Sequence, residues 1–365
     1  MASSSAHMTS LPLLFLISVT CLASMVQSSQ TRPMNNTVSA IYVFGDSTVD
    51  PGNNNYIKAL FKANWYPYGK DFINHTATGR FTNGKLATDF IASYVGIKEV
   101  IPAYLDPNIT LEDMMSGVAF ASAASGYDPV TASMSNAIHV PKQLDYFKDM
   151  KTKLEQSIGE ERTQEHIKKS VFIISAGTND FVLNYFNGVP LRRYSISVSD
   201  YQNLVLDQAK GLYQGLWDEG ARKIVVAGLP PMGCVPAVIT IHSSKTQGCY
   251  EDYNTVAQAF NDKLQDELSN MQNKLASDGA KIVYIDIFKP LDDIIKNYTK
   301  NGYDVPDSGC CGTGLIETSF MCNRAASLCT DASKYVFFDS IHPTEKAYHD
   351  VFESIIPVIN YVITN

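Results

Sequence analysis

Polar side chains that could carry out acyl transfer follow short apolar segments at three places in the chain. Ser47 ends a Gly-Asp-Ser tripeptide, and Asn179 lies in a Gly-Thr-Asn-Asp turn. Asp339 precedes His342 in the tetrapeptide Asp-Ser-Ile-His. An acyl-transfer site requires a hydroxyl nucleophile, an imidazole that accepts its proton, a carboxylate that orients the imidazole, and donors for the oxyanion. These four side chains supply each of those parts.

The candidate triad has the chain order Ser47, Asp339, His342, and triads are recognised by role rather than by position. Because Asp339 lies one short turn ahead of His342, its carboxylate can reach Nδ1 while Nε2 faces Ser47. The chain contains no Gly-x-Ser-x-Gly nucleophile elbow, which argues against an ordinary α/β-hydrolase. A secreted binding protein without turnover is the alternative from another class, and the intact triad disfavours it.

Alternating apolar and amphipathic segments predict the elements that position these residues. The candidate strands are continuous apolar runs, as in strands buried on both faces, and comprise residues 40–44, 117–121, 171–175, 223–227, 281–287 and 335–338. Helical patterns lie between them, at residues 143–158, 199–219, 250–278 and 344–362. The alternation predicts one domain with a parallel sheet that helices cover on both sides. Reacting groups in such sheets gather beyond the carboxyl ends of the strands, where the candidate residues fall.

Composition excludes some classes of function. The chain has 365 residues, of which 45% are hydrophobic and 18% charged, the profile of a globular protein with a substantial core. A formal net charge of −8 argues against a nucleic-acid surface, which needs clustered Lys and Arg. The sequence contains no polybasic run of the kind that would indicate a membrane-binding segment.

The N-terminus predicts a secretory signal. Residues 11–26 are almost wholly apolar, and the first charged side chain is Arg32. The apolar run is short for a spanning helix, which needs roughly 20 residues. Val26 and Ser28 suit the −3 and −1 positions of a cleavage site. We therefore expect a signal peptide at residues 1–28 and one domain at residues 29–365, with an uncleaved membrane anchor as the alternative.

Cysteines and glycosylation acceptors agree with export. An even number of cysteines follows the signal, which predicts three disulfides with fifteen possible pairings among Cys234, Cys249, Cys310, Cys311, Cys322 and Cys329. The first two form the favoured pair, because the other four crowd into one Gly-rich segment. A zinc site from those four is disfavoured by the absence of a CxxC pair and by export. Acceptor triplets for N-glycosylation begin at Asn35, Asn74, Asn108 and Asn297.

Other polar and aromatic residues near the motifs have structural interpretations. We expect Asp46 and Asp180 to bond to backbone N–H groups in their own turns. Asp50 and the Asn53-Asn54-Asn55 run are interpreted as a loop that lines the cleft. The aromatic residues of segment 65–68 are interpreted as core or cleft wall rather than a sugar platform.

Longer motifs resemble one family. FGDSTVDPGNNNY, GTND and DSIHPT resemble the first, third and fifth blocks of the SGNH hydrolase superfamily. The stretches YGKDF, TGRFTNGK, GLPPMGCVP, CCGTGLIE and SKYVFFDSIHP are similar to its plant GDSL-type esterase/lipase branch. Together they cover nearly the whole chain after the signal. Thr48 stands where the four-letter motif has Leu.

The resemblance implies a fold and residue roles. The implied fold is a flavodoxin-like three-layer α/β/α sandwich with a mostly parallel sheet of about five strands. Ser47 is the implied nucleophile, completed by Asp339 and His342. The implied oxyanion donors are the N–H of Ser47, the Asn179 side chain and a second-block N–H. A gapless alignment puts Ala124 at that second-block position, where the family usually has Gly. Alanine keeps the N–H if the turn does not demand positive φ.

The implied activity is that of a secreted esterase or lipase acting on lipid or small-molecule esters in the cell wall or apoplast. It requires no metal or organic cofactor, no nucleic acid and no stable membrane anchor after signal cleavage. An acyltransferase or a carbohydrate (acetyl) esterase with the same triad remains an alternative.

Overall fold

The computed structural model describes residues 1–2, 38–187, 191–242 and 248–364. Most of the predicted signal and the acceptor Asn35 lie outside the described residues. The chain from Arg32 to Asn365 forms one compact unit, and the fold described below belongs to it.

A parallel sheet of four strands runs through the described part of this unit. Its strands stand in chain order from one edge to the other: β1 (Ile41–Gly45), β2 (Val171–Ser175), β3 (Lys223–Ala227) and β4 (Lys281–Ile285). The first residues of neighbouring strands are paired, so the strands begin and end level. Residues that follow the strands therefore meet at one edge of the sheet.

The predicted strand at residues 117–121 lies beside β1 but forms only isolated bridges, one of them between Val43 and Ala119. The N–H of Phe120 donates to the carbonyl of Val43 at 2.7 Å, so the segment runs parallel to β1. On the edge away from β1, the carbonyl of Ala119 accepts the N–H of Tyr104 at 3.0 Å and the Asn53 amide at 2.8 Å. With this segment counted as the second strand, the sheet order is 2-1-3-4-5. That is the flavodoxin-like order, in which the ligand site lies at the switch point beside the first strand.

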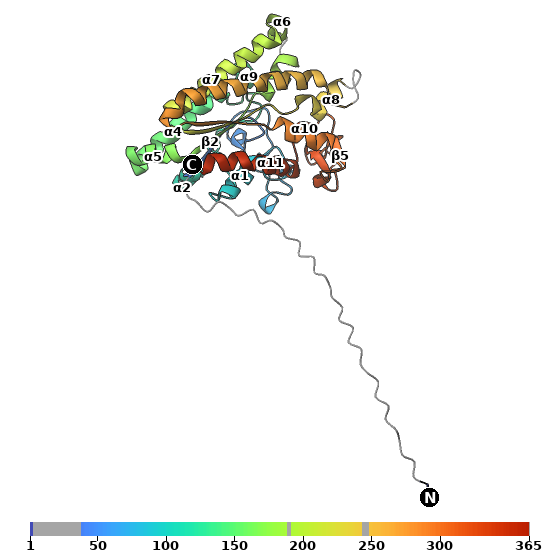
Figure 1. Ribbon diagram of the computed structural model, residues 1–365. Helices are drawn as coiled ribbons and strands as arrows, with labels where there is room; N and C mark the ends of the chain where they lie inside the picture. The colour runs from blue at the N-terminus through green and yellow to red at the C-terminus, as the bar shows by residue number, and fades with distance from the viewer. Residues whose placement is uncertain (3–37, 188–190, 243–247, 365) are drawn as a thin grey trace. The chain divides into compact units, whose positions relative to one another are not determined.

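Helices cover both faces of the sheet, as Figure 1 shows. One face is covered by α4 (Val140–Ile158), α7 (Val198–Asp218) and α9 (Glu251–Leu275), and the other by α1 (Ala87–Val95) and α11 (Glu345–Ile363). Because side chains alternate across a strand, successive residues of each strand enter different cores. The expected three-layer α/β/α sandwich is confirmed.

The two cores can be followed along β2. Phe172 and Ile174 belong to the core under α4, α7 and α9, whereas Val171 and Ile173 belong to the core under α1 and α11. Both faces are therefore apolar, which explains why the strands are continuous apolar runs without alternation.

The long helices lie close to their predicted positions, and the shorter ones were not predicted. These are α1, α2 (Leu111–Ser116), α3 (Pro129–Ser133), α5 (Glu160–Lys169), α6 (Leu191–Ser195), α8 (Pro236–His242), α10 (Phe288–Lys296) and a π-helix at Asp180–Phe186. Helices of this length depend on tertiary packing more than on their own propensity, so their sequences carry a weak signal.

The predicted strand at residues 335–338 does not belong to the main sheet. Its residues Tyr335–Phe337 form β6, which pairs in parallel with β5 (Val305–Gly309) in a separate two-stranded sheet. The sequence of β5, VPDSG, contains Pro and Gly, which are depleted in strands, so it was not predicted. The loop that carries Asp339 and His342 follows β6.

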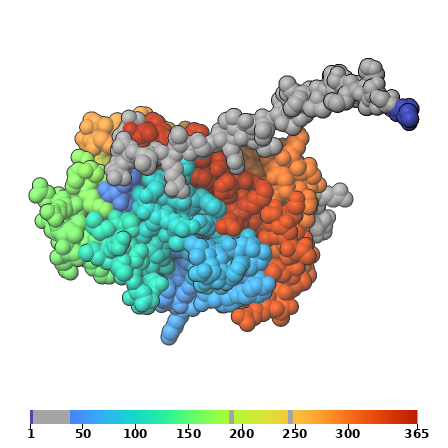
Figure 2. Space-filling model, turned by 90° about the horizontal axis from the view of Figure 1, so that it is seen from below, coloured from blue at the N-terminus to red at the C-terminus, as the bar shows by residue number. Residues whose placement is uncertain are grey.

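Three disulfides lie within the described residues. They join Cys234 to Cys249, Cys310 to Cys329 and Cys311 to Cys322. The favoured pair is present, and pairing of the other four cysteines excludes the zinc alternative for them. Cys310, Cys311 and Cys322 pack in one core cluster with Tyr68 and Phe338. Figure 2 shows the N-terminal part of the described chain, in blue, beside the C-terminal segments in orange and red.

Among the described residues, no helix has both the length and the apolarity that crossing a membrane would require.

Candidate active site

Ser47 lies just beyond the end of β1, at the switch point of the sheet. Gly45, the last residue of β1, has φ of +143°, and a side chain there would overlap the carbonyl oxygen of Ser175 at the end of β2. Only glycine allows this close approach of the two strand ends. Asp46 accepts the N–H of Thr48 at 3.0 Å and its hydroxyl at 2.8 Å, as expected for a residue that holds its own turn.

The structure brings the three candidate triad residues together. His342 Nε2 lies 2.8 Å from Ser47 Oγ, and His342 Nδ1 lies 2.8 Å from Asp339 Oδ2. The backbone N–H of His342 also donates to Asp339 Oδ1 at 2.7 Å, so one short loop fixes the carboxylate and the imidazole together. Phe81 packs against the imidazole with ring centroids 4.7 Å apart. All three triad side chains are buried, which limits their freedom to rotate.

Two further residues hold Asp339, and the sequence did not reveal them. The hydroxyls of Tyr68 and Thr318 donate to Asp339 Oδ2 at 2.7 and 2.9 Å. Burial by itself raises the pKa of Asp339, but the charge of His342 and the hydrogen bonds from His342, Tyr68 and the Ile341 N–H outweigh it and lower the pKa. Tyr68 is separated from Asp339 by 271 positions, so no local pattern could connect them. The carboxylate is therefore held as an anion that faces the imidazole.

The three candidate oxyanion donors belong to residues that line one pocket, Ser47, Ala124 and Asn179. Asn179 uses one amide hydrogen to donate to the carbonyl of Ser125 at 2.9 Å, which leaves the second amide hydrogen for a ligand. It makes no capping bond to the helix that follows. Within the described residues, the backbone N–H groups of Ser47 and Ala124 make no hydrogen bond. Ala124 has φ of +64°, so the turn does demand the left-handed conformation, and the N–H is presented nonetheless.

The Asp50–Asn55 segment braces this turn rather than lining the cleft, which corrects the interpretation from the sequence. Asp50 Oδ2 accepts the N–H of Ala123 at 3.0 Å, and the Asn54 amide donates to the carbonyl of Ala123 at 3.0 Å. Asp50, Asn53 and Asn54 are buried. Because the bonds reach Ala123, the neighbouring N–H of Ala124 is held in place.

Asp180 also braces the chain after Ala124, although we expected it to bond within its own turn. Its carboxylate accepts the N–H groups of Tyr127 and Asp128 at 2.8 and 3.0 Å, rather than groups of its own turn. A side chain at Gly126 would overlap this carboxylate, so glycine is required there. Burial, against these hydrogen bonds, raises the pKa of Asp180 to about 7.

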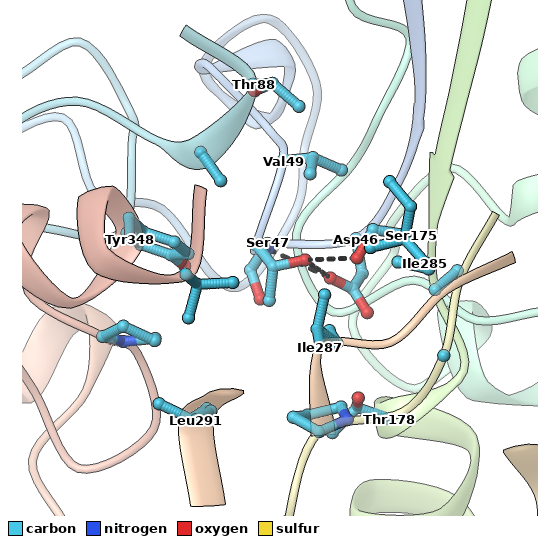
Figure 3. A pocket seen from close by; sticks show the side chains of 18 of the residues that line it. Asp46, Ser47, Val49, Thr88, Ser175, Thr178, Ile285, Ile287, Leu291 and Tyr348 are labelled. Carbon is cyan, nitrogen blue, oxygen red and sulfur yellow. Dashed lines mark hydrogen bonds between the residues drawn. The ribbon is translucent and has the colours of Figure 1, made fainter. Parts of the chain in front are cut away.

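Two pockets meet at Ser47. The triad pocket is lined by Ser47 and His342 of the candidate triad, and by Phe61, Phe81, Ala124, Asn179 and Leu183. The deep pocket lies between the sheet and α11, and its wall includes Thr88, Ile91, Ile285, Leu291, Tyr348 and Ile355. Figure 3 shows Ser47 at this pocket, with Tyr348 on one side and Ser175 and Ile285 on the other. Within the described residues, no group of three or more His, Cys, Asp or Glu side chains could hold a metal ion.

Comparison with known proteins shows the family to which the chain belongs. Residues 41–355 match the model of the GDSL-like lipase/acylhydrolases. The chain belongs to this family. It is 50% identical over 344 residues to the GDSL esterase/lipase At5g45960 of Arabidopsis thaliana, covering 93% of this chain and 92% of that protein. It is 43% identical over 342 residues to At2g40250 and 42% identical over 327 residues to At1g06990, both GDSL esterase/lipases of the same plant. These alignments cover 92% and 89% of this chain, and 92% and 90% of the respective relatives.

Membership in the GDSL-like lipase/acylhydrolases confirms the resemblance drawn from the motifs. The departure at Thr48 has a structural explanation within this family member. The Thr48 hydroxyl bonds to Asp46 at 2.8 Å and lies 3.1 Å from the hydroxyl of Ser175. Threonine therefore ties the serine turn to the end of β2, a contact that leucine could not make.

Proposed function

We propose that this chain is a secreted serine hydrolase that cleaves carboxylic esters through an acyl-Ser47 intermediate. The observation that carries the proposal is the continuous contact from Asp339 through His342 to Ser47, with 2.8 Å at each step. This geometry suits a general base that removes the proton of a hydroxyl nucleophile. Similarity over nearly the whole chain to proteins named esterase/lipases supports the same activity.

In the acylation step, Ser47 Oγ attacks the ester carbonyl carbon while its proton passes to His342 Nε2. The carbonyl oxygen becomes an oxyanion that accepts hydrogen bonds from the N–H groups of Ser47 and Ala124 and from Asn179 Nδ2. When the tetrahedral intermediate collapses, the carbon–oxygen bond to the alcohol breaks. His342 then returns its proton to the leaving oxygen, and the alcohol departs.

In the deacylation step, water takes the place of the alcohol. His342 Nε2 removes a proton from the water as it attacks the acyl carbon, and the same donors hold the second oxyanion. The bond to Ser47 Oγ then breaks, Oγ recovers the proton, and a carboxylic acid leaves. Asp339 keeps the imidazole oriented and stabilises its protonated form in both steps. These steps need only the side chains and backbone groups of the chain itself.

Export is part of the proposal and has separate support. The disulfides joining six cysteines suit an oxidising compartment. The acceptors Asn74 and Asn108 are exposed, and Asn297 is half-buried with its amide bonded to Asp293. The apolar N-terminal segment would act as the signal. A wall or apoplastic location is consistent with each of these features.

Labelling with a fluorophosphonate probe tests the assignment of the nucleophile. We expect the probe to modify the purified protein at Ser47, located by peptide mass spectrometry, because only this hydroxyl faces His342 Nε2 in the described structure. A label on another serine would contradict the proposal. Adding a competing alcohol to an ester substrate and analysing the products separates a hydrolase, which releases the acid, from an acyltransferase, which forms a new ester.

A further inference from the structure

Two pockets share Ser47, but only one of them is lined by His342, and this difference indicates which half of an ester each pocket binds. Ser47, Asn179 and Ile341 line both pockets, so a substrate carbonyl at Ser47 has access to each. His342 lines the triad pocket and is not part of the wall of the deep pocket. The two halves of a bound ester therefore meet different surroundings.

The leaving alcohol must lie on the side of His342, because its oxygen takes the proton that Nε2 carries. Such a transfer needs hydrogen-bond distance between the imidazole and the leaving oxygen. The alcohol half thus belongs in the triad pocket. The acyl half, on the opposite side of the carbonyl carbon, then points toward the deep pocket.

We propose that the deep pocket binds the acyl chain of the substrate, and that the Tyr348 hydroxyl selects chains that carry an oxygen atom. This assignment rests on the ester hydrolysis proposed above and specifies the substrate class for the same site. The class is esters of aliphatic acids long enough to enter the apolar pocket, with a hydroxyl or similar oxygen on the chain.

The shape and chemistry of the pocket suit an aliphatic chain. Along α11 its wall includes Tyr348, Val351 and Ile355, and seven residues of helix span about 10 Å. Ile91 of α1 and Ile285 of β4 face them from other elements. These side chains are buried, so a chain that enters leaves water behind. Each methylene buried in this way contributes about fourfold in affinity.

Among the described residues of this wall, Tyr348 alone has a buried polar side-chain atom without a hydrogen-bond partner. Its side chain is 6% exposed, and its hydroxyl has no hydrogen-bond partner within the described residues. Burial, and then the carboxylates of Asp46 and Asp339, raise its pKa well above the ordinary 10.0, so it remains a protonated donor. A buried hydroxyl without a partner is costly, and a plain alkyl chain would leave it so. An oxygen on the chain removes that cost.

Filling the pocket tests the acyl assignment. Val351→Phe places a ring in the deep pocket, and Val358→Phe makes the same change on α11 at a half-buried residue that lines neither pocket. Both variants would be assayed with p-nitrophenyl acetate, butyrate, octanoate and palmitate. We expect Val351→Phe to lower kcat/KM for octanoate relative to acetate tenfold or more, and Val358→Phe to leave that ratio unchanged. If Val351→Phe does not fold, Ile287→Phe fills the pocket from the segment after β4.

The outcomes separate the pocket assignment from the proposed activity. An unchanged acetate-to-octanoate ratio in a folded pocket-filled variant would overturn the acyl assignment. The acyl assignment would also be overturned if filling the pocket changed kcat/KM according to the alcohol half of the ester and not according to the acyl half. A wild-type protein that hydrolyses none of the esters and is not labelled by a fluorophosphonate would refute the activity, and the assignment with it.

Tyr348→Phe tests the selectivity. Substrates are p-nitrophenyl octanoate and a set of hydroxyoctanoates in which the hydroxyl is moved along the chain. We expect the wild type to prefer one of the hydroxylated esters, and the variant to lose that preference by about tenfold while it gains on plain octanoate. A merely structural role would scale all substrates equally, and that result would refute the selectivity.

Discussion

Replacing Ala124 by glycine should cost the protein little stability, because the structure holds this alanine at φ of +64°. The left-handed conformation costs an L-residue roughly 1–2 kcal/mol. Glycine avoids that strain but loses about 0.4–1 kcal/mol through the greater freedom of its unfolded chain, and about 0.8 kcal/mol through the missing buried methyl group. These terms nearly cancel, so we expect the free energy of unfolding to change by less than about 1 kcal/mol.

The matched control is Ala123→Gly, the same chemical change one residue earlier. Ala123 is fully buried in a core cluster, and its φ is not positive. The variant Ala123→Gly should therefore lose about 1–2 kcal/mol in free energy of unfolding, through the missing methyl group and the greater freedom of the unfolded chain. Urea unfolding followed by tryptophan fluorescence measures both variants. If Ala124→Gly were destabilised as much as Ala123→Gly, the turn would not have the conformation described.

Three further predictions concern the site. Asn179→Ala should lower kcat for a p-nitrophenyl ester about 10²–10³-fold by removing one oxyanion donor, and an unchanged kcat would refute that role. Asp339→Asn should lower kcat about 10⁴-fold while circular dichroism shows a folded protein, because an amide cannot hold the same imidazole tautomer; near-native turnover would contradict this. Burial raises the pKa of Asp180 from 3.8 to about 7, so the folded state keeps a proton that the unfolded chain has lost, and this contribution to stability disappears as pH rises through that window. The unfolding free energy of Asp180→Asn should therefore improve relative to wild type across the window, measured by urea titration at several pH values; a constant difference would contradict the assignment.

Much of the fold could be predicted because local signals agreed with it. Strands β1 to β3 are buried on both faces, and their continuous apolar runs stand out from the amphipathic helices between them. The predictions of secondary structure failed where contacts between distant parts of the chain determine the conformation. β5 contains Pro306 and Gly309 and forms a strand only because β6 lies beside it. The segment at residues 117–121 has a strand-like sequence, but it pairs with β1 only through an isolated bridge.

The residues of the candidate site also fall into those that local sequence signals reveal and those that depend on long-range contacts. Ser47, Asp339 and His342 could be found because each follows a strand and two of them share one turn. Tyr68 could not be found, since its bond to Asp339 links residues far apart in the sequence. The positive φ of Ala124 was also hidden, because alanine is not the residue that such a turn favours. Whether the turn demanded that conformation depended on Asp50 and Asn54, which brace it from a distant loop.

Hydrolysis of p-nitrophenyl esters by the wild-type protein and by Ser47→Ala tests the central claim most directly. The account predicts turnover by the wild type and a fall to background in the variant, which should still fold because the hydrogen bond of Ser47 Oγ within the described residues is to His342 alone. Fluorophosphonate labelling should disappear in parallel. Undiminished turnover by the variant would contradict the account, and so would a wild type that is inert toward every ester and toward the probe.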